Sequence, residues 1–291
     1  MCIRDSVPSL GERAARVLAR LGYGNVHTRV GDGYLGWEEH APFDKVIVTC
    51  SPEEVPAPLV EQLAEGGMVI IPVGERHQQQ LCRMVKQDGV LVSTSLRPTL
   101  FVPMTGTAEA RRRVLPDPSH PALLNGDFEL DLDRNQRVPG WYYQRRLELV
   151  ESAEAPSGTR FITFANDAPG QHAHLMQGLA IDGRVVKRVD FSASIASTNA
   201  RRGTHPENVP LAGITFYDGD RRALNSVVLG PVLGSQEFRA LQESRIRVPE
   251  TAREAIVRVG LFGGTGRVSF DNVNVSAVDN APVPQLSLIH I

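Results

Sequence analysis

Gly31-Asp32-Gly33-Tyr34-Leu35-Gly36-Trp37 forms a short acidic loop between two apolar runs of the chain. A strand pattern over residues 26–30 precedes the loop, and a buried-strand pattern over 43–49 follows it. A helix pattern over 56–65 and a further strand pattern over 67–74 come next. This order predicts an open α/β sheet with the loop at the carboxyl end of one strand, where such sheets bind their ligands.

The flanking segments extend the same α/β domain. Apolar residues recur at helical spacing over residues 10–21, and Gly22 is placed to end that helix. Residues 80–96 predict a hairpin that turns at Asp88-Gly89, and 100–104 is predicted to be a last strand. Together these segments predict the second half of a doubly wound domain that ends in antiparallel strands.

The composition is that of an ordinary globular protein. The chain has 291 residues, of which 42% are hydrophobic and 22% charged, and its length favours two domains. A formal net charge of −2 gives no electrostatic reason to expect nucleic acid or an anionic membrane as a partner, and no apolar run could span a bilayer. Cys2, Cys50 and Cys82 are too few and scattered for a disulfide framework or a metal site. Reduced thiols favour the cytoplasm.

The second half of the chain carries strand and turn signals. Residues 106–121 contain several prolines and the triplet Arg111-Arg112-Arg113, a pattern more typical of a solvated linker than of a contact patch. From 122 to 278, short alternating segments such as residues 185–196 are separated by turns. Many short strands with regular turns predict an all-β jelly-roll sandwich.

The two ends of the chain differ in character from the domains that they flank. Residues 1–6 and the end of the tail at 279–291 resemble translated adapter sequence, and we expect neither to be native. With both set aside, we expect the α/β domain at 7–105 and the sandwich at 122–278.

An ordered set of motifs in the α/β domain resembles the protein-L-isoaspartate (D-aspartate) O-methyltransferase family. The motifs are Leu21-Gly22-Tyr23-Gly24-Asn25-Val26, the Gly31-Asp32-Gly33 loop, Ala41-Pro42-Phe43-Asp44, Ile71-Pro72-Val73-Gly74 and Phe101-Val102-Pro103-Met104. A lone Gly-Asp-Gly carries little information, whereas this order and spacing are specific. The resemblance covers roughly the second half of that family's catalytic domain and implies a Rossmann-like class I methyltransferase fold.

The resemblance implies methyl transfer from S-adenosylmethionine to the carboxylate of isoaspartyl or D-aspartyl residues, a repair reaction on damaged proteins. A carboxylate with a pKa near ~4 is already ionised at neutral pH, so no general base is needed. The rate then comes from positioning the oxygen in line with the methyl group and from excluding water. We therefore assign no catalytic side chain. Cys50 is interpreted as a small strand-end residue, because no base lies near it in the sequence.

Four residues of this domain are candidates for binding. By similarity, Asp32 accepts a hydrogen bond from the exocyclic amine of the adenine, and Gly31 and Gly33 allow close backbone approach. The alternative is an ordinary turn aspartate between two glycines. The backbone at Val102 matches a family position that meets the isoaspartyl group of the substrate, and the alternative is an edge strand ending at Pro103.

Part of the family's machinery is not found in this sequence. Its glycine-rich loop for the methionine end of the cofactor and its substrate-contacting serine would precede Val7. Asp5 falls where the ribose-binding acid of the family would stand, but it belongs to the leader that we set aside. We expect the parent gene to encode the loop upstream, and this chain alone to bind S-adenosylmethionine poorly.

The second domain has a resemblance of its own. Residues 125–129 and 139–141, with the closing run 268–273, resemble a galactose-binding-like, carbohydrate-binding-module sandwich. The resemblance implies a glycan ligand. Trp141-Tyr142-Tyr143 could stack on a sugar ring, although the alternation of a strand predicts that at least one of the three points into the core.

Two sets of polar residues in this domain are candidate metal ligands. Asn125, Glu129 and Asp271 offer hard oxygen atoms for a structural calcium ion, although polar residues in turns and at strand ends would give the same pattern. His172 and His174 alternate along a strand without further ligands, which favours exposed strand residues over a metal pair.

Two other functions stay open at this point. The chain could be a ligand-binding module that carries an inactive methyltransferase remnant, in which case residues 122–278 alone would bind a glycan. It could also be another class I methyltransferase with a different acceptor, which the Phe101-Val102-Pro103-Met104 ending disfavours.

Overall fold

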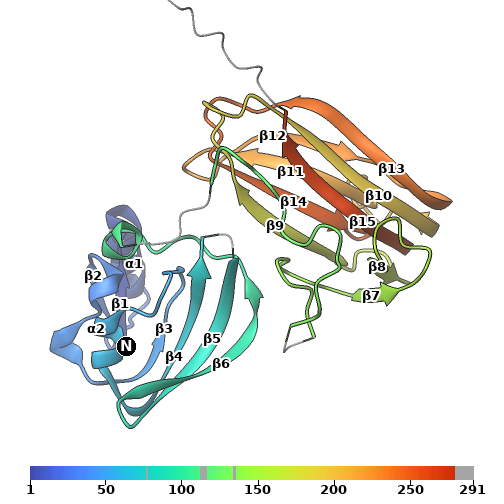
Figure 1. Cartoon of the computed structure of the whole chain (residues 1–291). Coiled ribbons are helices and arrows are strands. Elements are labelled where there is room, and N and C mark those ends of the chain that lie inside the picture. The colour runs from blue at the N-terminus through green and yellow to red at the C-terminus, as the bar shows by residue number, and fades with distance from the viewer. Residues whose placement is uncertain (77, 112–116, 134–135, 279–291) are drawn as a thin grey trace, which may run out of the picture. The chain divides into compact units, whose positions relative to one another are not determined.

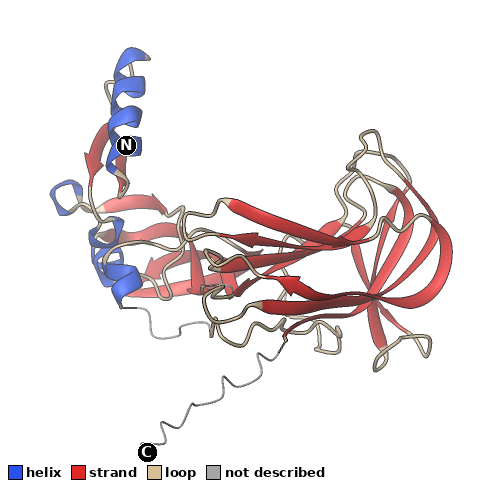
Figure 2. Ribbon diagram, turned by 90° about the horizontal axis from the view of Figure 1, so that it is seen from above, coloured by secondary structure: helices blue, strands red, loops and turns tan. Residues whose placement is uncertain are grey.

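The computed structural model describes residues 1–76, 78–111, 117–133 and 136–278. The chain divides into two compact units, Met1–Pro116 and Asp117–Ile291, called unit 1 and unit 2 below. Strands make up most of the regular structure (Figure 2). No helix in these ranges is long and apolar enough to cross a membrane. The predicted tail and residues 112–116 of the predicted linker lie outside the described residues.

Unit 1 begins with a strand–helix–strand motif. Strands β1 (Cys2–Asp5) and β2 (His27–Val30) pair in parallel, and helix α1 (Pro8–Arg20) connects them (Figure 1). Pro8 begins the helix, where its missing N–H costs no hydrogen bond. The helix predicted over 10–21 is confirmed. Strand β1 was not predicted, since it lies in the segment set aside as a leader.

The other strands of unit 1 form a second sheet in the order β3-β4-β5-β6. They are β3 (Phe43–Ile47), β4 (Leu63–Glu75), β5 (Gln78–Gln87) and β6 (Val90–Thr99). The first two are parallel with helix α2 (Ala57–Glu61) between them in sequence, and the others are antiparallel. The hairpin predicted at Asp88-Gly89 is confirmed. Both turn residues have positive φ, 52° and 75°, as a type I′ turn requires.

The structure differs from the predicted α/β sheet in several places. Two sheets stand where one was expected. Helix α2 is shorter than the predicted helix because Leu63, only 2% exposed, already begins β4 opposite Phe43. Residues 100–104 contribute a single parallel bridge, Ser51 to Pro103, rather than a strand. A short helix, α3 (Thr107–Ala110), lies in the predicted linker.

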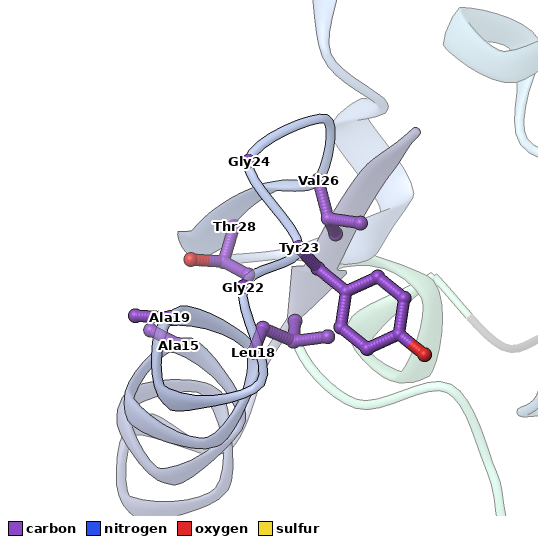
Figure 3. Close-up of a pocket in the computed structure, with 8 residues that line it drawn as sticks. All are labelled: Ala15, Leu18, Ala19, Gly22, Tyr23, Gly24, Val26 and Thr28. Atoms are coloured by element: carbon purple, nitrogen blue, oxygen red, sulfur yellow. The ribbon is translucent and has the colours of Figure 1, made fainter.

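The core of unit 1 is small. Its buried members lie on β4 and β5 and are Leu63, Val69, Ile71, Cys82 and Met84. Helix α1 buries only Gly11, and Leu10 is 52% exposed. Beside this helix lies an open hollow of about 300 Å³, whose lining includes Leu18 and Tyr23 (Figure 3). Of the apolar residues at helical spacing, Leu10 and Leu21 are exposed, and the described residues cover the others only in part.

Unit 2 consists of two antiparallel sheets, and the predicted β-sandwich is confirmed. Their strand orders are β13-β10-β15-β8-β7 and β12-β11-β14-β9 (Figure 1). In chain order the strands are β7 (Leu147–Glu151), β8 (Arg160–Asn166), β9 (His174–Ala180), β10 (Arg188–Arg201), β11 (Leu211–Tyr217), β12 (Ala223–Leu229), β13 (Gly234–Arg247), β14 (Glu254–Gly260) and β15 (Thr265–Ala277).

One hydrophobic core holds unit 2 together, and both sheets contribute to it. Its fully buried aromatic members are Phe128, Trp141, Phe164, Phe191, Phe216 and Phe270. The alternation predicted for residues 185–196 is confirmed, because Val189, Ala193 and Ile195 of β10 join this core. Since each buried aromatic side chain removes about 150–250 Å² from water, this core is the main source of the unit's stability.

Candidate functional site

The carboxyl ends of parallel strands carry the candidate residues of unit 1. Asp5 ends β1, Asp32 follows β2, and Cys50 lies shortly after β3. Asp32 caps the single turn η1 (Gly33–Leu35), where its Oδ1 accepts a hydrogen bond from the Tyr34 amide at 3.0 Å. This edge is where ligands bind in open α/β sheets.

The other carboxylate oxygen of Asp32 is occupied from far along the chain. Its Oδ2 accepts hydrogen bonds from the amide of Thr107 at 2.9 Å and from the Thr107 hydroxyl at 2.7 Å. Burial alone would raise the pKa of Asp32, but the hydrogen bonds from Thr107 and Tyr34 and the charge of Arg4 outweigh it. The pKa is therefore lowered, and Asp32 is an ionised acceptor at neutral pH.

The segment that contains Val102 runs across this edge of the unit. The Ser51 amide donates to the Val102 carbonyl at 2.8 Å, and the Met104 amide donates to the Ser51 carbonyl at 3.0 Å. The Thr105 hydroxyl then meets that of Ser6 at 3.3 Å. The Val102 side chain is 48% exposed, and its amide makes no hydrogen bond to another described residue. An available backbone donor thus lies in the segment that leads to Thr107.

The side chain of Gln62 holds the Gly31–Trp37 loop from outside it. The Oε1 atom of Gln62 accepts from the Trp37 amide at 2.6 Å, and its Nε2 donates to the Leu35 carbonyl at 3.1 Å. Gly36 has a φ of 59°, and a Cβ atom there would collide with Gln62. Gln62 and Gly36 therefore determine the course of the loop together. Gln62 is not among the candidate residues predicted from the sequence.

Arg4 is a second residue that sequence reasoning missed. Its Nη1 donates to the Gly36 carbonyl, and its guanidinium lies beside Gly31. Burial, followed by the charge of Arg29, lowers the pKa of Arg4. Because Arg4 lies in the segment set aside as a leader, the sequence offered no separate signal for it.

Cys50 remains a thiol at neutral pH. Burial raises the pKa of Cys50, and the negative charges of Asp32 and Asp5 raise it further. A nucleophilic cysteine needs the opposite shift, toward the thiolate. This environment agrees with its interpretation as a small residue at a strand end.

In unit 2, backbone amides already donate hydrogen bonds to two of the predicted calcium ligands, Asn125 and Glu129. The Asn125 Oδ1 atom accepts from the Leu130 amide at 3.1 Å. The Glu129 Oε1 atom accepts from the amides of Thr159 at 2.8 Å and Arg160 at 2.7 Å. These side chains hold turns in place.

Asp271 completes the predicted calcium set and has the same kind of environment. Its two oxygens accept from the amides of Ser157 at 2.8 Å and Asn272 at 2.6 Å. Burial, opposed by these bonds and assisted by the charges of Glu129 and Asp127, raises the pKa of Asp271 to about 6. Among the described residues, no group of three or more His, Cys, Asp or Glu side chains is arranged to hold a metal ion. The calcium site of Asn125, Glu129 and Asp271 stays a prediction.

The aromatic and histidine candidates of unit 2 differ in how far their side chains are buried. Trp141 and Tyr142 are buried, whereas Tyr143 is 41% exposed, so the prediction that at least one points inward is confirmed. His174 stacks on Phe262 with ring centroids 5.3 Å apart. Burial and neighbouring positive charges lower the pKa of His174 to about 4.

Most of unit 1 is similar to a known protein family. Residues 3–109 match the protein-L-isoaspartate(D-aspartate) O-methyltransferase family. Over 102 residues the chain is 46% identical to the protein-L-isoaspartate O-methyltransferase of Gloeobacter violaceus, which covers 35% of this chain and 50% of the relative. The chain spans about half the length of the curated relatives it matches. The matched region begins inside β1 and therefore includes Arg4 and Asp5.

Solved structures give weaker likenesses. A Plasmodium falciparum protein described as a putative protein-L-isoaspartate O-methyltransferase, in complex with S-adenosyl-L-homocysteine, is 28% identical with a TM-score of 0.32, covering 35% of this chain and 51% of that one. A cyclase from Fischerella sp. TAU is 17% identical with a TM-score of 0.35, covering 53% and 94%. The carbohydrate-binding module TmCBM61 with β-1,4-galactotriose is 14% identical with a TM-score of 0.31, covering 53% and 92%. Scores this low leave the ligand of unit 2 undecided.

Proposed function

We propose that this chain is part of a protein-L-isoaspartate O-methyltransferase, which transfers a methyl group from S-adenosylmethionine to isoaspartyl or D-aspartyl carboxylates in damaged proteins. The family match over residues 3–109 carries the proposal. The candidate residues at the carboxyl ends of parallel strands support it. Because the matched relatives are about twice as long as the matched region, the activity is proposed for a whole protein of that length.

Asp32 is the proposed contact of the cofactor's adenine. An ionised carboxylate has about four acceptor positions, and Tyr34 and Thr107 occupy some of them without filling the set. A remaining position can accept the exocyclic amine, and Gly31 and Gly33 place no side chain in its way. The cofactor, when bound, supplies an electrophilic methyl group on a sulfonium ion.

The amide of Val102 is the proposed donor to the isoaspartyl group. Gln79 Nε2 donates to the Phe101 carbonyl of the same peptide unit at 3.0 Å, and the Ser51 amide donates to the Val102 carbonyl that follows, so hydrogen bonds on both sides determine the direction of the donor. A neutral donor orients the substrate without removing the negative charge of the attacking carboxylate. That is sufficient here, because the nucleophile is already ionised and needs only positioning.

A chimera tests this proposal. The part of the Gloeobacter violaceus relative that precedes its aligned region is joined to this chain at residue 3, and transfer of labelled methyl groups to an isoaspartyl peptide is measured. We expect transfer to that peptide and none to the same peptide with ordinary aspartate. Asp32→Asn should raise the KM for S-adenosylmethionine about tenfold, as loss of ~1.4 kcal/mol would do. The exposed Asp44→Asn is the matched control. A folded chimera that binds S-adenosylhomocysteine but transfers no methyl group would contradict the proposal.

We propose that unit 2 binds a glycan. We also propose that the protein is located in the cytoplasm. Tyr143 supports the first point, since its exposed ring is available to stack on a sugar. Cys2, Cys50 and Cys82 are free thiols, which supports the second. A glycan array probed with the whole chain tests glycan binding, and a clean negative result would remove it.

A further inference from the structure

Unit 2 contains a hollow with a strongly basic lining. It has a volume of about 680 Å³ and lies where β10 begins and β13 ends. We call it the basic hollow, and its charged lining residues are Lys187, Arg188, Arg245, Arg247 and Glu250. None of the four cations forms an ion pair with another residue in the described ranges, unlike Arg160 and Arg184 of the same unit. Four cations therefore face one carboxylate.

Two of these arginines stand directly opposite each other. Arg188 of β10 pairs with Arg247 of β13 in the antiparallel register, so both side chains lie on the same face of the sheet. Their neighbours Val189 and Ile246 are buried, which directs both arginines outward. Like charges at directly opposed positions destabilise a sheet. An anion between them would reverse the sign of that interaction.

Local backbone structure positions the other two cations. The register of β10 and β13 shifts after Val189, and in this bulge Arg245 has a φ of 57°. The Asp190 Oδ1 atom accepts a hydrogen bond from the Arg245 amide at 2.6 Å, which holds the bulge. Bulges of this kind re-aim a side chain at sheet edges. The Lys187 ammonium donates to the Gly183 carbonyl at 3.0 Å and retains further donors for a ligand.

We propose that the basic hollow binds an acidic oligosaccharide, through the carboxylate or sulfate groups that its sugars carry. The proposal rests on the proposed glycan binding of unit 2. Guanidinium groups bind such oxyanions with two parallel hydrogen bonds. The volume is suited to a ligand larger than a single inorganic ion. Among the described residues, no aromatic side chain lines the hollow, so nucleobases and neutral sugars would lack a stacking surface.

Calorimetry on the full chain tests the proposal. The probes are trigalacturonate for carboxylates, a heparin tetrasaccharide for sulfates, neutral galactotriose, and inorganic phosphate. We expect at least one acidic oligosaccharide to bind, with affinity falling as salt is raised because the charges are exposed. Arg188→Gln and Arg247→Gln should each weaken binding about tenfold, through loss of one charged contact. Arg239→Gln, exposed on the same strand and outside the hollow, should not change it.

The outcomes distinguish this proposal from the broader proposal that unit 2 binds a glycan. Binding of acidic sugars that is lost in both hollow variants supports it. Binding of galactotriose without either acidic oligosaccharide, or binding of acidic sugars that is unaffected by these variants, would overturn the basic hollow and leave glycan binding of unit 2 standing. Binding of phosphate alone, or of no probe, would overturn the proposal as well. Thermal unfolding without ligand controls for folding, because removing one of two opposed arginines should leave the melting temperature unchanged or raise it.

Discussion

Thr107 donates two hydrogen bonds to one carboxylate oxygen of Asp32, from its amide at 2.9 Å and from its hydroxyl at 2.7 Å. The two residues are 75 positions apart in the chain. The carboxylate that we propose for the adenine therefore also holds the first residue of α3. Any ligand that competes for Asp32 will change the environment of Thr107.

Replacing Asp32 by asparagine should loosen α3. Hydrogen bonds to a charged acceptor contribute about 1.5–3 kcal/mol each, so we expect unit 1 to lose about 2 kcal/mol of unfolding free energy. Hydrogen exchange of the Thr107 amide, measured by NMR, checks this directly, with Asp44→Asn as the control. Unchanged protection of that amide in Asp32→Asn would show that the carboxylate does not hold it.

The hydrogen bonds from Thr107 to Asp32 should weaken in acid. Because the folded state lowers the pKa of Asp32, its stabilisation is present above the unfolded pKa, near ~4, and is lost as the pH falls through the folded value. Protection of the Thr107 amide should therefore decrease in acid in the parent chain and be independent of pH in Asp32→Asn. Equal pH dependence in both proteins would contradict the assignment.

Gln62→Ala should release the Gly31–Trp37 loop. The substitution removes both hydrogen bonds that Gln62 makes to Leu35 and Trp37. At about 1 kcal/mol for each neutral bond, and more for a donor left without a partner, a loss of about 2 kcal/mol is expected. Faster hydrogen exchange at Trp37 would report it. The exposed Gln87→Ala is the control, and an equal effect there would refute a specific role for Gln62.

Asp271 should stabilise unit 2 as the pH is lowered from 7 to 5, while His174, whose pKa is lowered to about 4, should act in the opposite direction by about 2 kcal/mol. Asp271 has its pKa raised to about 6, so the folded state binds a proton there that the unfolded state does not. Stability from this group is highest in acid and falls as the pH rises through 6, and the change between pH 5 and 7 is about 1 kcal/mol. The difference between the parent chain and Asp271→Asn in urea unfolding at the two pH values measures the contribution of Asp271. Asp271→Asn should abolish this part of the pH dependence.

Calcium should leave the stability of unit 2 unchanged. Backbone amides already donate to oxygens of Asn125, Glu129 and Asp271 and hold the turns there without an ion. Melting temperatures in excess calcium chloride and in EDTA should therefore agree. A melting temperature that rises by several degrees with calcium would support the calcium site predicted from the sequence.

Local patterns in the sequence were sufficient for several regular elements, although not for β1 or α3. The helix over 10–21 follows from apolar spacing, the hairpin from Asp88-Gly89, and the alternation of β10 from its residues alone. Each of these depends on interactions between near neighbours or on the burial of one face. The motifs around Asp32 likewise locate the candidate site, because their order and spacing along the chain are specific.

The contacts that build the site depended on the tertiary structure. Gln62 reaches Trp37, and Thr107 reaches Asp32, across long stretches of chain. Both are polar side chains whose partners are backbone or carboxylate groups, so no periodic pattern marks them. The calcium prediction has the same limit: residue type shows which oxygens can bind an ion, and only the fold shows which amides already donate to them. The sequence determined which residue types are available for binding, and the tertiary structure decided which of them lie close together.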